Sequence, residues 1–231
     1  MIPKKIHYCW FGGNPLPKDV QKYIDTWRKY CPDYEIKEWN EQNFDIHLNR
    51  YVEEAYQQKK WAFVSDVARI YALYTEGGIY MDTDVEVIRN LDPLLNSRGF
   101  LGFEGTRWIA TNIVGFESNH ELLKQFLDSY NHRVFLKQDG SLDQTTNVEE
   151  LTKLLVEEYS LLLNGKLQNL LGDVTIYPTD YFSPYDYIQG KLKRTSNTYS
   201  IHWFSQTWIG QSKWRKKIAQ IIHRILKIKM K

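Results

Sequence analysis

The chain has 231 residues, of which 42% are apolar and 25% are charged. These values are typical of one folded domain, or of one domain with a small appendage, and no apolar run is long enough to cross a bilayer. The first residues lack the apolar stretch and cleavage site of a signal peptide, so we expect a cytoplasmic protein. Its two cysteines, Cys9 and Cys31, are then expected to be reduced thiols, with a single disulfide as the alternative.

The net charge of +2 conceals an uneven distribution. Residues 212–231 contain eight Lys or Arg and no acid, so the rest of the chain has 22 basic and 28 acidic residues, a net charge of −6. This acidic body argues against a broad nucleic-acid footprint, and we expect no nucleic-acid partner.

Hydrophobic periodicity predicts strands that alternate with helices, most clearly over the first 130 residues. This order indicates an α/β sandwich. The expected helices are 18–30, 61–76, 120–131 and 147–163, and the expected extended segments are 4–12, 34–40, 79–82, 85–88, 100–104, 111–117, 174–178 and 199–204.

Two aspartates one residue apart, Asp82 and Asp84, follow a Gly-Gly pair and a short apolar segment. If the glycines reverse the chain after the 61–76 helix, roughly 13–20 Å of extended chain returns along roughly 16 Å of helix. The aspartates then reach the level of Asp66 and Arg69, which share a helical face. On an extended backbone both aspartates point the same way. The spacing therefore predicts that three carboxylates and one guanidinium converge.

Like charges held together need a positive partner. A divalent cation that prefers oxygen ligands, Mg²⁺ or Mn²⁺, is the simplest candidate, because such ions bridge one or two carboxylates to phosphate oxygens. A solvated surface turn is the alternative interpretation of an isolated Asp-x-Asp. The upstream Ser-Asp-x-x-Arg and the intervening glycines favour the metal site.

The block "SDVARIYALYTEGGIYMDTDVEV" (65–87) resembles the sugar-binding region with a D-x-D motif of glycosyltransferase family 32. The segments "IPKKIHYCWFGG" and "YSIHWFSQTW" resemble the family's opening strand and its C-terminal segment. This resemblance implies a GT-A fold, which is a Rossmann-like mixed sheet that binds a nucleotide-sugar with a divalent metal. It also implies a retaining hexosyltransferase that uses a saccharide or lipid-linked saccharide acceptor in capsular polysaccharide or lipopolysaccharide synthesis.

The resemblance assigns roles to individual residues of this chain. Asp82 and Asp84 form the D-x-D, with Asp84 the more direct metal ligand, and Asp66 and Arg69 bind hydroxyls of the donor sugar. His202 is expected as a third metal ligand, for which an imidazole is chemically suited.

The remaining assignments concern the nucleotide. Trp10 is expected to stack on the uracil of a UDP-sugar, although a tryptophan of the core is the alternative. Ser205 and Trp208 lie in the segment that closes over the diphosphate. The chain has "SQTW" where the family often has a Ser-Trp pair, and it lacks the Thr-Gly-Pro motif of eukaryotic members.

The resemblance also constrains the mechanism. A double displacement requires a nucleophile beneath the anomeric carbon, and no sequence feature nominates one. We therefore favour a front-side route, in which the metal, His202 and Trp208 stabilise the leaving UDP.

The C-terminal segment 212–231 is expected to form a basic amphipathic helix, separate from a glycosyltransferase domain at 1–211. Such a helix suits the anionic inner face of a cell membrane, and docking on the domain or on a partner is the alternative. Two rival functions were weighed, a metal-dependent phosphoesterase or nuclease and a non-catalytic carbohydrate-binding protein. The four charged residues of the predicted cluster disfavour the second of these rivals.

Overall fold

The structure is a computed structural model that describes residues 1–205, and it has the expected α/β architecture. The helices are α1 (Lys18–Tyr30), α2 (Arg50–Gln57), α3 (Trp61–Glu76), α4 (Glu121–Ser129), α5 (Asn147–Tyr159) and α6 (Thr179–Phe182), with 3₁₀ turns η1 (Asp92–Leu94) and η2 (Tyr130–His132). The strands are β1 (Lys5–Cys9), β2 (Glu35–Trp39), β3 (Gly78–Met81), β4 (Val85–Val87), β5 (Gly99–Glu104), β6 (Trp108–Phe116), β7 (Gln168–Leu170), β8 (Val174–Tyr177), β9 (Tyr185–Asp186), β10 (Lys191–Leu192) and β11 (Ser200–His202).

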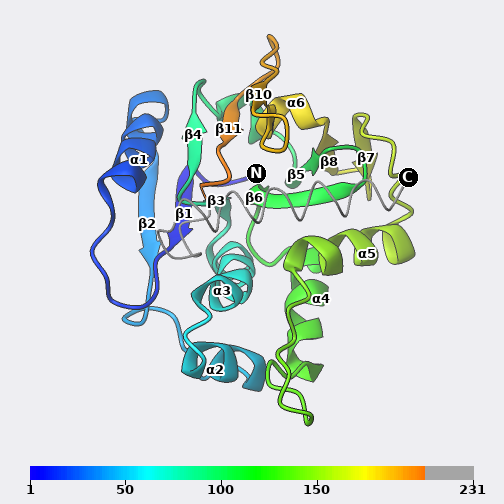
Figure 1. The fold of residues 1–231 in the computed structure, drawn as a ribbon. Helices are drawn as coiled ribbons and strands as arrows, with labels where there is room; N and C mark the ends of the chain where they lie inside the picture. The colour runs from blue at the N-terminus through cyan, green and yellow to red at the C-terminus, as the bar shows by residue number, and fades with distance from the viewer. Residues whose placement is uncertain (206–231) are drawn as a thin grey trace.

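A seven-stranded mixed sheet forms the centre of the fold, in the order β2-β1-β3-β6-β5-β8-β7. Strand β1 is parallel to β2 and β3, and β5 is parallel to β8, whereas β6 is antiparallel to both β3 and β5. Figure 1 shows helices on both sides of this sheet. The parallel strands β1, β2 and β3 place their carboxyl ends at one edge, where ligands bind in open α/β sheets.

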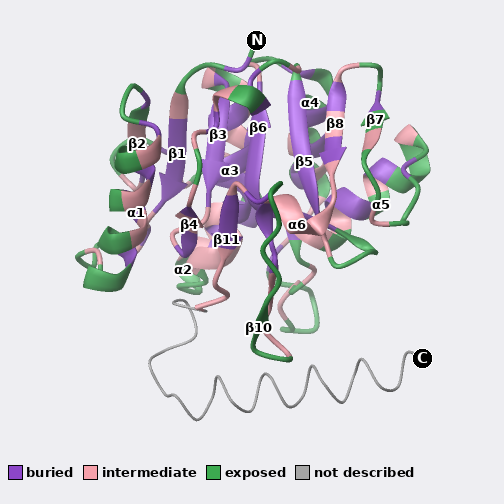
Figure 2. Ribbon diagram, turned by 90° about the horizontal axis from the view of Figure 1, so that it is seen from above, coloured by how far each residue is buried: buried purple, intermediate pink, exposed green. Residues whose placement is uncertain are grey.

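Each face of the sheet is covered by its own hydrophobic core, and the central strands are buried (Figure 2). Helices α2, α3, α4 and α5 cover one face, while α1, β4 and α6 cover the other. Because both faces of β3 are buried, its sequence is continuously apolar and does not alternate between apolar and polar residues.

The predicted elements are confirmed, with two exact matches at α1 and α3. The features that were not predicted are the helices α2 and α6, the 3₁₀ turn η1, the edge strand β7 and the β9–β10 hairpin. The last expected helix also ends earlier than predicted, at Tyr159, because Ser160 adopts a left-handed backbone with φ 56°. Both cysteines are buried free thiols, as expected. The predicted boundary at 211 and the tail at 212–231 lie outside the described residues, and no helix within 1–205 is long and apolar enough to cross a membrane.

The Gly77–Gly78 pair performs the predicted reversal between α3 and β3. Gly77 ends the helix with φ 65°, and Gly78 continues with φ 111°, two values that favour glycine. The buried His7 locks this corner: its Nε2–H donates to the carbonyl of Gly77 at 2.7 Å, and its Nδ1 accepts from Trp39 Nε1 at 2.9 Å. Burial lowers the pKa of His7 to about 4, so the ring is neutral and structural.

Gly78 gives the first test of the fold. A Cβ at this position would lie 2.6 Å from the backbone oxygen of Lys5, which cannot move without breaking β1, whereas a Cβ at Gly140 (φ 80°) meets nothing within 4 Å. We expect Gly78→Ala to lower the free energy of unfolding by roughly 3 kcal/mol and Gly140→Ala by about 1 kcal/mol, measured by urea denaturation. Equal losses in the two variants would show that the close approach at Gly78 is not a constraint.

Candidate functional site

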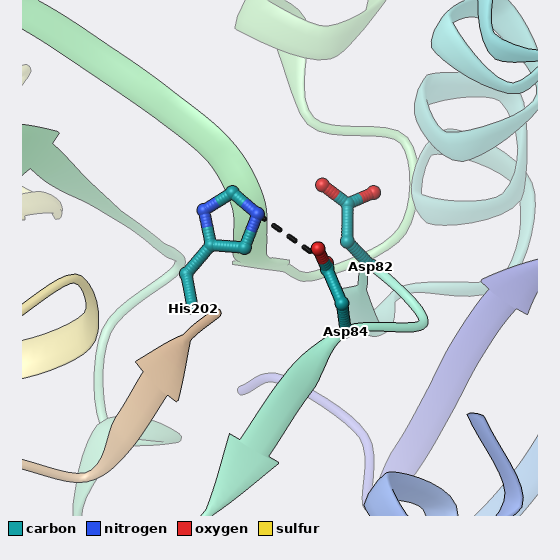
Figure 3. Close-up of side chains that lie close together, drawn as sticks. All are labelled: Asp82, Asp84 and His202. Atoms are coloured by element: carbon teal, nitrogen blue, oxygen red, sulfur yellow. Dashed lines mark ion pairs between the residues drawn. The ribbon is translucent and has the colours of Figure 1, made fainter. Parts of the chain in front are cut away.

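The D-x-D segment forms a tight turn between β3 and β4. The amide of Val85 donates to the carbonyl of Asp82 at 3.0 Å, and the amide of Asp82 donates to the carbonyl of Asn112 on β6 at 2.8 Å. The expectation of an extended backbone was therefore wrong, because the chain leaves the main sheet here to enter β4. The carboxylates still lie close together, since both project from the same turn (Figure 3).

His202 reaches this turn through strand pairing. Strand β11 pairs antiparallel with β4, and His202 lies opposite Val85, one residue beyond Asp84. Its Nε2 is 3.3 Å from Oδ1 of Asp84 (Figure 3). Although burial disfavours the charged ring, the carboxylate of Asp84 raises the pKa of His202 to about 9.

Asp84 is held from both sides. Its Oδ1 faces His202, and its Oδ2 accepts from the amide and the hydroxyl of Ser205 at 2.7 and 3.0 Å. Although burial opposes ionisation, the charge of His202 and the hydrogen bonds from His202 and Ser205 lower the pKa of Asp84 to about 2. Ser205 thus lies beside the D-x-D, while Trp208 lies outside the described residues.

Arg69 is the centre of a second group of charges. Its guanidinium lies 3.1 Å from Oδ1 of Asp66 and 3.2 Å from Oδ1 of Asp82, and 8% of its side chain is exposed. It stacks 4.6 Å from the ring of Tyr80, whose hydroxyl donates to Asp82 at 3.0 Å. The predicted convergence of Asp66, Arg69 and Asp82 is confirmed.

Two residues that the sequence did not indicate complete this group. Thr111 on β6 accepts from Arg69 through its carbonyl at 2.9 Å and through its hydroxyl at 3.3 Å. The Thr111 hydroxyl then donates to Oδ1 of Asn147, the first residue of α5, at 2.9 Å. Burial, opposed by Arg69, raises the pKa of Asp66 to about 6. A buried carboxyl with a raised pKa beside a guanidinium is typical of a functional site.

A cavity of about 480 Å³ connects both groups. Its lining includes Asp66, Arg69, Asp82, Asp84 and His202, together with the aromatic residues Trp10, Phe11, Trp61, Phe63 and Phe204. Trp10 and Trp61 also line a neighbouring cavity of about 810 Å³ beyond the ends of β1 and β2. Trp10 is half-buried, and its Nε1 donates to the carbonyl of Asn14 at 2.6 Å, which fixes the ring at the boundary between the two cavities.

Asp82, Asp84 and His202 fit a divalent cation. One ligand atom from each residue lies within 4.8 Å of the others, while opposite ligands of an ion such as Mg²⁺ are separated by about 4.2 Å. Carboxylates and imidazole are both common ligands of divalent ions.

Comparisons with known proteins concern the same part of the chain. Residues 17–101 match a protein family described as a glycosyltransferase sugar-binding region containing a DXD motif, and the matched range includes Asp66, Arg69, Asp82 and Asp84. The chain is 32% identical over 136 residues to inositol phosphoceramide mannosyltransferase 3 of Schizosaccharomyces pombe, covering 54% of this chain and 36% of that protein. It is 24% identical over 195 residues to the uncharacterized glycosyltransferase L373 of Acanthamoeba polyphaga mimivirus, covering 80% of this chain and 74% of that protein.

The fold is also shared with a solved structure. PaToxG glycosyltransferase superposes with a TM-score of 0.53 over 68% of this chain and 69% of that one, at 18% sequence identity. The chain thus spans about a third of the yeast mannosyltransferase, but it contains the central sheet and the D-x-D turn. Residues 17–101 thus match a glycosyltransferase sugar-binding region containing a DXD motif, and the chain as a whole has a GT-A fold.

Proposed function

We propose that this protein is a retaining, metal-dependent glycosyltransferase. It moves a hexose or an N-acetylhexosamine from a UDP-sugar to a saccharide or lipid-linked saccharide acceptor during surface polysaccharide or lipopolysaccharide synthesis. The observation that carries the proposal is the single cavity in which the Asp82–Asp84–His202 group lies beside the buried Asp66–Arg69 pair. The name of the yeast relative supports a lipid-linked acceptor, since that enzyme acts on a ceramide lipid.

The donor extends across the cavity in this proposal. Asp66 accepts hydrogen bonds from sugar hydroxyls, and Arg69 donates from a planar fork that Asp66, Asp82 and Thr111 already hold in place. A Mn²⁺ or Mg²⁺ ion would be held by Asp82, Asp84 and His202. When bound, it would neutralise the negative charge of the diphosphate. The nucleoside then extends toward Trp10, at the boundary with the second cavity.

The carboxylates of the cavity favour front-side transfer. Asp66 and Asp82 are paired with Arg69, and Asp84 is paired with His202 and Ser205, so each carboxylate that lines the cavity within residues 1–205 already has an ionic partner. No further carboxylate lines the cavity within residues 1–205 that could be assigned as a dedicated nucleophile for double displacement. The acceptor hydroxyl therefore bonds to the anomeric carbon as the bond to the phosphate oxygen breaks. Its proton passes to that departing oxygen.

A two-metal phosphoesterase is disfavoured by the position of the other possible cation site among residues 1–205, His120, Glu121 and Asp173. His120 follows the end of β6, where Phe116 pairs with Gly78 at the start of β3. The D-x-D turn follows the opposite end of β3. The two groups thus lie beyond opposite ends of the central strands. They are too far apart to bind the same phosphate.

Peripheral membrane contact at the inner face of the membrane remains part of the proposal, carried by the basic sequence 212–231. We expect the full chain to float with vesicles that contain anionic lipid, and a 1–211 truncation to float less. The comparison is repeated at high salt, which should weaken the binding of the full chain. Equal flotation of the two proteins would remove the membrane from the proposal.

Asp84 gives the direct test of the metal site. Asp84→Asn keeps the size of the side chain but removes a charge that faces the proposed ion, so we expect Mn²⁺-dependent hydrolysis of UDP-sugars to fall about a hundredfold or more. Hydrolysis is measured over a panel of UDP-glucose, UDP-galactose, UDP-N-acetylglucosamine and GDP-mannose, with EDTA as the metal-free reference. Asp25→Asn, on the exposed surface of α1, is the matched control. Unchanged turnover in a folded Asp84→Asn variant would refute the mechanism.

The His202–Asp84 pair predicts a pH-dependent stability of the metal-free protein. The pKa of His202 is raised from 6.5 to about 9. The contribution of the ion pair to the free energy of unfolding is therefore complete below pH 6.5 and is lost as the pH rises through 9. Asp84 has a lowered pKa, so the same pair is lost as the pH falls from 3.8 toward 2. In EDTA, we expect the free energy of unfolding of wild type to exceed that of His202→Gln by on the order of 3 kcal/mol near pH 6. The difference between the two proteins should be small at pH 9.5.

The measurement is urea unfolding between pH 5 and pH 9.5. His47→Gln replaces an exposed histidine outside the cavity and controls for the general effect of the substitution. A difference between wild type and His202→Gln that stays constant across this range would contradict the ion pair.

A further inference from the structure

Asn147 has an unused hydrogen-bond donor in the wall of the cavity. The residue is 3% exposed, it lines the cavity, and its Nδ2 has no hydrogen-bond partner among residues 1–205. An unpaired buried amide is destabilising, so a folded protein retains one where a ligand supplies the missing acceptor.

A chain of hydrogen bonds fixes which end of this amide faces the ligand. Arg69 can only donate, so the Thr111 hydroxyl accepts from it and directs its own hydrogen to Oδ1 of Asn147 at 2.9 Å. The reversed amide would leave the Thr111 hydrogen and the Asn147 oxygen without partners. The oxygen is therefore engaged, and both hydrogens of Nδ2 remain free.

The position of Asn147 at the start of α5 adds to this donor. Helix α5 packs on β6 (Figure 1) and begins beside Asp66, whose carboxylate interacts with the backbone amide of Asn147. The cavity wall thus presents an acceptor, the Asp66 carboxylate, next to a donor, the Asn147 amide. A hydroxyl group donates one hydrogen bond and accepts another from a single atom, so it satisfies this pair, whereas a deoxy position, which has neither donor nor acceptor, does not.

We infer that Asn147 is a specificity-determining residue that reads a hydroxyl of the donor sugar together with Asp66. The inference rests on the proposed function. It adds one residue that contacts the donor sugar and one requirement on the structure of that sugar. The sugar must carry a free hydroxyl at the position that faces α5, and Thr111 acts as the positioning residue that orients the amide.

The test uses Asn147→Leu, which keeps the branched shape of the side chain and removes both the donor and the acceptor of Thr111. We expect kcat/KM for Mn²⁺-dependent hydrolysis of the preferred UDP-sugar to fall about tenfold to a hundredfold. The Kd of UDP with Mn²⁺ should change by less than about twofold, because UDP has no sugar. Asn169→Leu, at an exposed position of β7, should retain wild-type kinetics.

Monodeoxy analogues of the preferred UDP-sugar give the decisive measurement. For one deoxy position, we expect the penalty seen in wild type to become clearly smaller in Asn147→Leu, since one of the two partners of that hydroxyl is already missing. Thr111→Val should reduce the same penalty without abolishing it. A merely structural role for Asn147 would instead lower the melting temperature and weaken all analogues equally.

The outcomes separate this inference from the proposed function. If wild type hydrolyses no nucleotide-sugar with Mn²⁺, the proposed function fails and the inference fails with it. If wild type is active but Asn147→Leu has the same kcat/KM and the same deoxy penalties, the inference alone is overturned. A uniform loss together with a lowered melting temperature also overturns it.

Discussion

The buried guanidinium of Arg69 is the constraint on which the site depends. An isolated charge at this depth would be very costly, and its ion pairs with Asp66 and Asp82 make its burial possible. Those two carboxylates come from different elements, the middle of α3 and the end of β3. The reversal at Gly77–Gly78 must therefore bring the two elements back to the same level. The ion pairs and the folded-back backbone thus require each other, and removing one partner would leave a buried charge uncompensated.

The charges of the cavity also explain why a divalent ion suits it. With Asp66, Asp82 and Asp84 ionised and Arg69 protonated, the group has a formal charge of −2 when His202 is neutral. In the metal-free protein the proton on His202 offsets part of this charge, which is why the pKa of His202 rises to about 9. A divalent ion would offset all of it, and its binding would compete with the proton on His202.

The local parts of this site could be predicted from the sequence, and the parts built from distant segments could not. Asp66 and Arg69 share a helical face, and the glycines that reverse the chain are adjacent, so α3 and its meeting with Asp82 follow from spacing. The turn at the D-x-D could not be predicted, because it depends on β4 leaving the main sheet to pair with β11. Asn147 carries no recognisable motif, and its contact with Thr111 follows only when α5 is placed against β6. Helix α2 had a signal that was overlooked, since Asn49 caps it by accepting from Val52.

The segment after β11 fixes the relative positions of Asp84 and His202. Phe204 has φ 51°, a left-handed conformation that costs a bulky residue about 1–2 kcal/mol. Its ring lies 3.9 Å from that of His202 and 4.4 Å from that of Tyr187, and the next residue donates twice to Asp84. These contacts offset the strain only while Asp84 and His202 are near each other. The same contacts hold the carboxylate of Asp84 and the imidazole of His202 close to each other. The strained backbone at Phe204 is therefore a consequence of building the site from two segments that are distant in the sequence.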